Sequence, residues 1–207
     1  MTFPFDDLTR GRVAELCSAF ERMPAEQSGK TLKHAAVAIA LTGTADETTF
    51  LLTRRASTLR AHGGQWALPG GRCDAGKTAA QAALRELDEE LGLSLDESSV
   101  LGILDDYPTR SGYLITPVVV WAGRDPQLRP NPGEVASVHH VPVSHIIREE
   151  AVSFQAIPES ERLVVRIFIE NNHVNAPTAA LLYQFREVLI GRTTRVAHYE
   201  QPVFAWR

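Results

Sequence analysis

The feature that most constrains the fold of this chain is a glycine-rich loop at residues 70–77 that leads directly into a helix. Thr78 and Gln81 have the spacing of a capping box, which begins a helix. Alanines and leucines fill the following turns and favour helix, and Gly92 stands where a helix usually ends. The sequence therefore predicts a helix over 78–91 that starts immediately after the loop.

Three glutamates lie on one face of that predicted helix. Glu86, Glu89 and Glu90 are three and four residues apart, so their side chains project together. Their repulsion weakens a bare helix, whereas a hard divalent cation, Mg²⁺ or Mn²⁺, takes carboxylate oxygens as ligands and removes that cost. Such a cation can also neutralise a diphosphate and activate a water. The alternative is a solvated acidic face, and the preceding loop favours the metal site over it.

The loop and helix together resemble the Nudix box, whose pattern is G-x5-E-x7-R-E-U-x-E-E-x-G-U with U a bulky aliphatic residue. The matching residues are Gly71, Arg85, Glu86, Leu87, Glu89, Glu90, Gly92 and Leu93. The resemblance implies an α/β (α+β) fold, an α/β/α sandwich around a mixed sheet. It also implies that Glu86, Glu89 and Glu90 bind metal and supply catalytic groups beside Arg85, joined by the backbone carbonyl of Gly70.

One position departs from the Nudix pattern. The family has a glutamate where this chain has Lys77, and in relatives that glutamate usually supports the box arginine, here Arg85, or the metal network. A lysine cannot accept a hydrogen bond from a guanidinium, so Arg85 must find another partner, and the helix glutamates compete for it. We expect Lys77 to attenuate catalysis without abolishing it. The alternative is a neutral surface lysine on a tolerant loop.

The residues before the box resemble a second motif, LLTxR(S/A)xxxRxxxGxxxFPGG, which precedes the Nudix box in coenzyme A diphosphatases. Residues 51–71 follow it with Leu68 in place of the usual phenylalanine. Residues 101–105, 116–119 and 131–135 also resemble that subfamily, so the likeness covers about 35–147. It implies hydrolysis of coenzyme A, or an acyl derivative, to adenosine 3′,5′-bisphosphate and a phosphopantetheine.

Coenzyme A carries a diphosphate and a ribose 3′-phosphate, so its enzyme needs several cationic contacts. Arg54, Arg55 and Arg60, with His62, supply them in this interpretation, although any one of them alone reads as a solvated loop charge. Glu134 is a candidate distal metal ligand or base, and an exposed loop glutamate is an equal alternative.

Two histidines and two cysteines receive no catalytic role. His139 and His140 are expected on an alternating strand and are interpreted as structural. Cys17 and Cys73 lie far apart, which excludes a metal-spaced pair and argues against a disulfide framework. A reducing compartment, the cytoplasm, is therefore expected.

Charge and hydropathy exclude several kinds of partner. The formal net charge is -4 and the isoelectric point is about 6.0, so no basic surface predicts binding to nucleic acid or an acidic membrane. No apolar stretch is long enough to span a bilayer, and the N-terminus shows no secretory pattern. The expected partner is a small nucleotide, which local arginines, lysines or metal ions must attract.

The chain is expected to form one Nudix domain over 1–207. An N-terminal helix is predicted at about 8–23 and a C-terminal helix and tail at about 177–207, the helix carrying an apolar stripe that packs in the core. The apolar tail packs either on its own domain or on a neighbouring subunit, which makes a homodimer a candidate. The expected strands cover residues 35–41, 50–54, 100–105, 113–121, 135–141 and 163–169.

Two other functions remain open at this point. One is hydrolysis of another nucleoside diphosphate derivative, such as NADH or ADP-ribose, because such enzymes share every box residue and Leu68 departs from the coenzyme A motif. The other is a Nudix module that senses a nucleotide without cutting it. Lys77 favours the sensor, whereas the intact Glu86, Glu89 and Glu90 argue against it.

Overall fold

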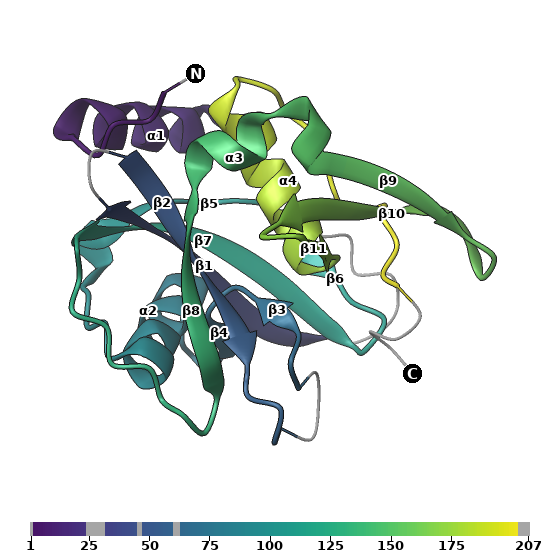
Figure 1. Ribbon diagram of the computed structural model, residues 1–207, viewed down its shortest axis with the longest axis horizontal. Coiled ribbons are helices and arrows are strands. Elements are labelled where there is room, and N and C mark those ends of the chain that lie inside the picture. The colour runs from purple at the N-terminus through teal and green to yellow at the C-terminus, as the bar shows by residue number, and fades with distance from the viewer. Residues whose placement is uncertain (1, 24–31, 45–46, 60–62, 203–207) are drawn as a thin grey trace.

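A mixed β-sheet runs through the centre of the molecule and carries helices on both faces (Figure 1). The computed structural model describes residues 2–23, 32–44, 47–59 and 63–202. Strands β1 and β7 pair in parallel, and the other described pairings of this sheet are antiparallel. Its strands are β1 (Lys33–Thr44), β2 (Glu47–Arg55), β3 (Trp66–Ala67), β4 (Gly70–Arg72), β5 (Val100–Ile103), β6 (Tyr107–Pro108), β7 (Tyr113–Arg124) and β8 (Val135–Pro142).

Alternation along β1 divides the core between the two faces of the sheet. Ala36, Ala38 and Ala40 pack with the apolar residues of α2, while Ile39 and Leu41 pack with those of α1, α3 and α4. This layering confirms the expected α+β sandwich around a mixed sheet. The helices are α1 (Asp7–Ala19), α2 (Ala79–Leu91), α3 (Val143–Ile147) and α4 (Thr178–Leu189), with short 3₁₀ turns at Glu97–Ser99 and Glu149–Ala151.

A second, three-stranded antiparallel sheet lies beside α4 (Figure 1). Val165 and Ile167 of this sheet are buried in the same core cluster as Leu181 and Phe185 of α4. Glu200 forms a β-bridge with its middle strand and so ties the C-terminal segment to the sheet. Its strands are β9 (Val152–Ile157), β10 (Ser160–Ile169) and β11 (Asn172–Asn175).

The two terminal segments compare differently with their predictions. The first helix ends at Ala19 rather than near residue 23, and it begins where the Asp6 carboxylate accepts a hydrogen bond from the N–H of Thr9 at 2.8 Å. The stripe on α4 lies in the core as expected. The described part of the tail packs on its own domain, because Val196 is fully buried. The apolar residues at 203–207 lie outside the described residues, and the homodimer stays a prediction.

Several short elements were not predicted from the sequence. β3, β4, β6, β9, β11 and α3 have two to six residues each, which is too short for hydrophobic periodicity to register. None of the helices in the described residues combines the length and apolar character needed to cross a bilayer.

Candidate functional site

The predicted helix α2 is held at both ends as expected. Gln81 donates its N–H to Thr78 Oγ1 at 3.1 Å, and Thr78 donates its N–H to Gln81 Oε1 at 3.3 Å, which completes the capping box. Gly92 ends the helix in the left-handed conformation with a φ of 65°. The helix therefore presents its acidic residues from a fixed backbone.

The glutamates of α2 occupy two different environments. Glu86 and Glu90 are buried, with 8% and 3% of their surface exposed, whereas the Glu89 side chain is 53% exposed. Burial raises the pKa of Glu90 to about 8, the neighbouring Glu86 adds to this, and Arg55 opposes it. Burial also raises the pKa of Glu86. A buried pair of carboxyl groups with raised pKa values is an environment that a divalent cation stabilises.

Arg85 binds two of the three helix glutamates. It donates from Nη1 to Glu89 Oε2 at 2.6 Å and from Nη2 to Glu86 Oε1 at 2.7 Å. Nη2 also donates to the carbonyl oxygen of Arg72 at 2.9 Å, and Nε lies 3.6 Å from Asp74 Oδ2. Lys77 is exposed at the other end of the loop. Arg85 therefore pairs with two of the helix glutamates, and the attenuation expected from Lys77 stays a prediction.

Glu134 lies close to the buried pair. Its charge contributes to the raised pKa values of Glu86 and Glu90, and its Oε1 accepts a hydrogen bond from Asn131 Nδ2 at 3.2 Å. These carboxylates are the hard oxygen donors that Mg²⁺ and Mn²⁺ prefer, so the donor set fits such an ion. Within the described residues, no three acidic, histidine or cysteine side chains already converge as ligands.

Two glycines allow the loop to approach the acidic helix and the sheet. A Cβ on Gly71 would lie 2.2 Å from Glu86 Oε1, and one on Gly70 would lie 2.3 Å from the carbonyl oxygen of Ala36. The backbone N–H of Gly70 also donates to the Glu90 carboxylate. A side chain at position 70 would meet the backbone of β1, whereas one at position 71 would push the Glu86 carboxylate aside.

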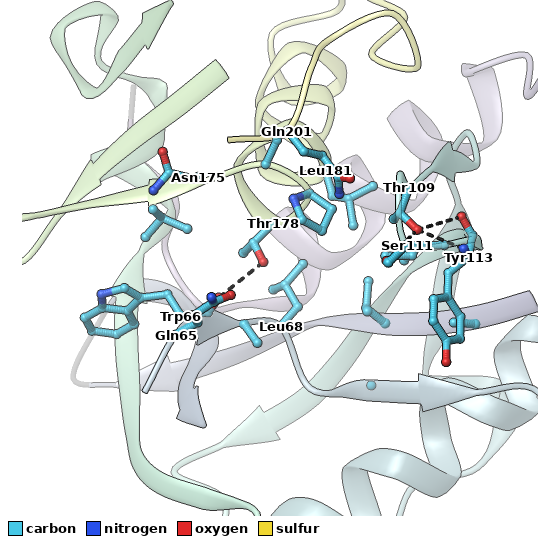
Figure 2. A pocket seen from close by; sticks show the side chains of 18 of the residues that line it. Gln65, Trp66, Leu68, Thr109, Ser111, Tyr113, Asn175, Thr178, Leu181 and Gln201 are labelled. Carbon is cyan, nitrogen blue, oxygen red and sulfur yellow. Dashed lines mark hydrogen bonds between the residues drawn. The ribbon is translucent and has the colours of Figure 1, made fainter. Parts of the chain in front are cut away.

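A cavity of about 650 Å³ opens beside this loop, a size suited to a small ligand. Trp66 and Tyr113 stand at opposite ends of it (Figure 2). Its polar and charged lining residues are Arg55, Gln65, Arg72, Thr109, Ser111, His173, Asn175, Thr178 and Gln201. The cavity therefore combines aromatic end walls with many hydrogen-bonding groups.

Arg55 connects the cavity to the acidic pair. It lines the cavity, its charge lowers the pKa of Glu90, and its Nε is buried without a hydrogen-bond partner among the described residues. The charge of Arg55, which lines the cavity, can attract an anionic ligand to this point. Arg55 is thus the upstream arginine best placed to contact a phosphate near the carboxylates.

Of the other cations predicted upstream of the Nudix box, Arg54 is described by the structure, and Arg60 and His62 are not. Arg54 does not line the cavity; its Nη2 donates to the carbonyl oxygen of Gly64 at 3.0 Å and its guanidinium lies 5.4 Å from the Trp66 ring centroid. Arg60 and His62, both predicted to bind substrate, lie outside the described residues. Of the two that the structure describes, Arg54 and Arg55, it brings Arg55 to the acidic site.

Most residues of the cavity wall were not predicted from the sequence. Residues 173–181 and Gln201 contribute to the cavity but follow α2 by more than 80 positions. Thr178 Oγ1 donates to the Trp66 carbonyl oxygen at 3.4 Å, which joins this far wall to the near one (Figure 2). No motif marks these residues, because tertiary packing alone assembles them.

The cysteines and His140 match their structural interpretation. Cys17 and Cys73 are free, and burial raises the pKa of Cys17 to about 12 and raises that of Cys73 against the effect of Arg85. His140 Nδ1 lies 3.2 Å from Thr42 Oγ1, and burial lowers the pKa of this histidine. Neither thiol is activated as a nucleophile.

Comparisons with known proteins point to one family. The family model described as NUDIX domain matches residues 32–160. A protein of Photorhabdus laumondii named Uncharacterized Nudix hydrolase NudL is 38% identical over 125 residues, covering 60% of this chain and 66% of the relative. A protein of the same name from Pectobacterium atrosepticum is 32% identical over 140 residues, covering 66% of this chain and 72% of the relative.

Solved structures of similar fold include a Nudix hydrolase from M. Smegmatis, RenU. It superposes with a TM-score of 0.49 at 21% identity, covering 76% of this chain and 86% of that one. The MutT protein from Methanosarcina mazei Go1 gives a TM-score of 0.46 at 21% identity, covering 57% of this chain and 82% of that one.

Proposed function

This chain belongs to the NUDIX domain family and is a Nudix hydrolase, and from that premise we propose that it cleaves the diphosphate bond of coenzyme A or an acyl-coenzyme A. The products are adenosine 3′,5′-bisphosphate and a phosphopantetheine. The observation that carries the proposal is the cavity of about 650 Å³ that meets the acidic site at Arg55. The coenzyme A-like motif at residues 51–71 supports the same substrate.

The cavity accommodates the chemical parts of such a substrate. The Trp66 and Tyr113 rings offer surfaces on which an adenine can stack, and Ser111, Asn175 and Gln201 offer donors and acceptors for its polar groups. The diphosphate then lies at the mouth nearest Arg55. This orientation places the bond to be cut beside the carboxylates of α2.

Different residues have separate roles in the proposed reaction. Arg55 donates to a diphosphate oxygen and holds the substrate in place. Glu86, Glu89, Glu90 and the Gly70 carbonyl would hold Mg²⁺ or Mn²⁺, which would supply a Lewis acid for the phosphate and lower the pKa of a bound water. Glu134, or one of the helix glutamates, takes the proton of the attacking water.

The free thiols of Cys17 and Cys73 suit a cytoplasmic location.

The proposal is tested by product analysis over a substrate panel. Purified protein is incubated with Mg²⁺ and with coenzyme A, acetyl-coenzyme A, NADH or ADP-ribose, and products are separated by chromatography. The proposal expects adenosine 3′,5′-bisphosphate from both coenzyme A compounds at a higher kcat/KM than any product from NADH or ADP-ribose. A preference for ADP-ribose or NADH would replace the substrate and retain the hydrolase.

A nucleotide sensor is the second candidate, because Arg85 binds Glu86 and Glu89. The same panel separates the two functions when binding is measured alongside cleavage by calorimetry. Tight binding of a nucleotide without cleavage of any compound, with Mg²⁺ or Mn²⁺ present, would establish the sensor and reject the hydrolase.

A further inference from the structure

Three side chains outside the acidic site form a continuous hydrogen-bonded chain. Ser137 Oγ lies 2.8 Å from His139 Nε2, and His139 Nδ1 lies 2.8 Å from Glu170 Oε2. The residues come from two separate places, strand β8 and the turn between β10 and β11. A hydroxyl on one imidazole nitrogen and a carboxylate on the other is the arrangement that activates a serine as a nucleophile.

The fold places Ser137, His139 and Glu170 where solvent can reach them. Ser137 and His139 are two residues apart on an edge strand, so their side chains share one face of the sheet. Ser137 is partly exposed, the His139 side chain is 22% exposed and that of Glu170 is 50% exposed. A small substrate can therefore reach the serine hydroxyl from solvent.

The neighbouring strands add a cation and an aromatic wall. Ser137 pairs across the sheet with Arg54, which in turn pairs with Trp66. The Trp66 ring meets His139 edge-on at 4.5 Å between centroids. The ladder is irregular next to Ser137, between Arg54 and Arg55, and such bulges commonly re-aim a side chain beside an active site.

We propose that Ser137, His139 and Glu170 form a second hydrolytic site, which cleaves activated acyl groups, esters or thioesters, without a metal ion. Ser137 is the nucleophile and His139 the general base. Glu170 is a positioning residue that accepts from His139 Nδ1–H and so leaves Nε2 free to accept the serine proton. Arg54, whose backbone pairs with Ser137, is the nearest cation on β2 that could stabilise the negative charge of the carbonyl oxygen.

The reaction balances over two steps. Ser137 Oγ bonds to the acyl carbon as its proton passes to His139 Nε2, and the alcohol or thiol leaves with that proton. Water then attacks the acyl-serine, gives its proton to His139, and releases the carboxylic acid as the proton returns to Ser137 Oγ. No oxidant, reductant or metal enters either step.

The alternative is that these hydrogen bonds have only a structural role, which we call a latch. The His139–Glu170 contact holds the β10–β11 turn against β8, and the serine could merely satisfy the second ring nitrogen. A purely structural role does not require an accessible serine, and a serine with only that role would not react with electrophiles.

The test is covalent labelling of the full-length protein with a fluorophosphonate probe, followed by peptide mass spectrometry, with EDTA present. The proposal expects the probe on Ser137 and slow release of nitrophenol from p-nitrophenyl acetate. Ser137→Ala should abolish both signals, and His139→Ala should lower the labelling rate about 100-fold, the usual contribution of a general base. Unlabelled Ser137 in the folded wild type would overturn the proposal.

Matched variants separate catalysis from folding. His140→Ala alters the neighbouring histidine of the same strand, on its opposite face, and should label like the wild type. Glu170→Gln should lower kcat for p-nitrophenyl acetate about 10-fold or more with KM unchanged, because it misorients the imidazole. If Glu170→Gln lowers only the melting temperature and leaves kcat intact, the latch is correct. Since EDTA removes divalent ions, these results are independent of diphosphate cleavage.

Discussion

The acidic helix and the cavity beside it are assembled in opposite ways. Glu86, Glu89 and Glu90 lie within five consecutive residues on one capped helix, so local geometry alone brings them together. The cavity joins Trp66 and Gln201, which are more than 130 residues apart in the sequence. A site made by one helix is visible in its spacing, whereas a site made by several segments emerges only when the chain is folded.

The two regions also differ in their physical chemistry. The acidic region concentrates charge under partial burial, which raises the pKa of Glu90 to about 8. The cavity is lined mainly by aliphatic and aromatic side chains, with neutral polar groups among them and charges at Arg55 and Arg72. Changes in the acidic region should therefore affect cleavage of every substrate, while changes in the cavity should affect which substrate binds.

The largest effect is expected at Glu90. Glu90→Gln keeps the shape of the side chain but removes the charge that a cation requires, so turnover should fall about 100- to 1,000-fold at saturating Mg²⁺, as for other single electrostatic groups. Asp88→Asn, an exposed neighbour on the same helix, is the control and should retain activity. Near wild-type turnover of Glu90→Gln would remove Glu90 from the metal site.

A smaller loss is expected at Arg55, which joins the two regions. Arg55→Ala should lower kcat/KM for coenzyme A about 10- to 100-fold, the effect of one charge-assisted hydrogen bond of about 1.5–3 kcal/mol. Arg54→Ala should cost less, because Arg54 lies outside the cavity lining and its guanidinium already binds Gly64. Equal losses in steady-state kinetics of the two variants would contradict the assignment of the phosphate contact to Arg55.

The far wall of the cavity depends on an ion pair in the C-terminal segment. Arg110 Nε donates to Glu200 Oε1 at 3.0 Å, and the N–H of Arg110 donates to Gln201 Oε1 at 2.8 Å. Hydrogen bonding from Arg110 lowers the pKa of Glu200 to about 2. Glu200→Gln should therefore lower the free energy of unfolding by about 1–2 kcal/mol at neutral pH, discounted because Arg110 is half exposed.

The pH dependence of that loss is the specific signature. The Glu200 pKa is lower in the folded state, so its stabilisation is present above the ordinary carboxyl pKa and disappears as the pH falls through about 2. Urea unfolding at pH 7 and pH 3 should show the difference between wild type and variant shrinking at the lower pH. A constant difference in the free energy of unfolding at both pH values would mean that packing, rather than charge, holds the segment. Glu161→Gln, at an exposed residue, is the control.

The smallest effect is expected at Lys77. Lys77→Glu offers Arg85 another acceptor and should free Glu86 and Glu89 for metal, but Lys77 is exposed, so the shift in Mg²⁺ affinity should be a few-fold at most. Activity is measured against Mg²⁺ concentration for both proteins. Coinciding curves would make Lys77 a neutral surface residue.

The sequence predicted the parts of the molecule whose signals are local. The capping box at Thr78, the stop at Gly92 and the core stripe of α4 all lie where their spacing placed them. The different burial of Glu86 and Glu89 could not be predicted, because it depends on how the helix packs against the loop and the sheet. The same holds for Gln201, whose position in the cavity follows from the Arg110–Glu200 pair rather than from any motif.

The division between a catalytic helix and a selective cavity is tested most directly by the ratio of kcat/KM for coenzyme A to that for UDP-glucose, a diphosphate that has no adenine to stack on Trp66. The ratio is measured with Mg²⁺ in the wild type, in Glu89→Gln and in Trp66→Ala. We expect Glu89→Gln to lower both values by a common factor and leave the ratio unchanged. We expect Trp66→Ala to change the ratio by about 10-fold or more, as losing an aromatic stacking contact does. A ratio that moves in Glu89→Gln and stays fixed in Trp66→Ala would contradict this division.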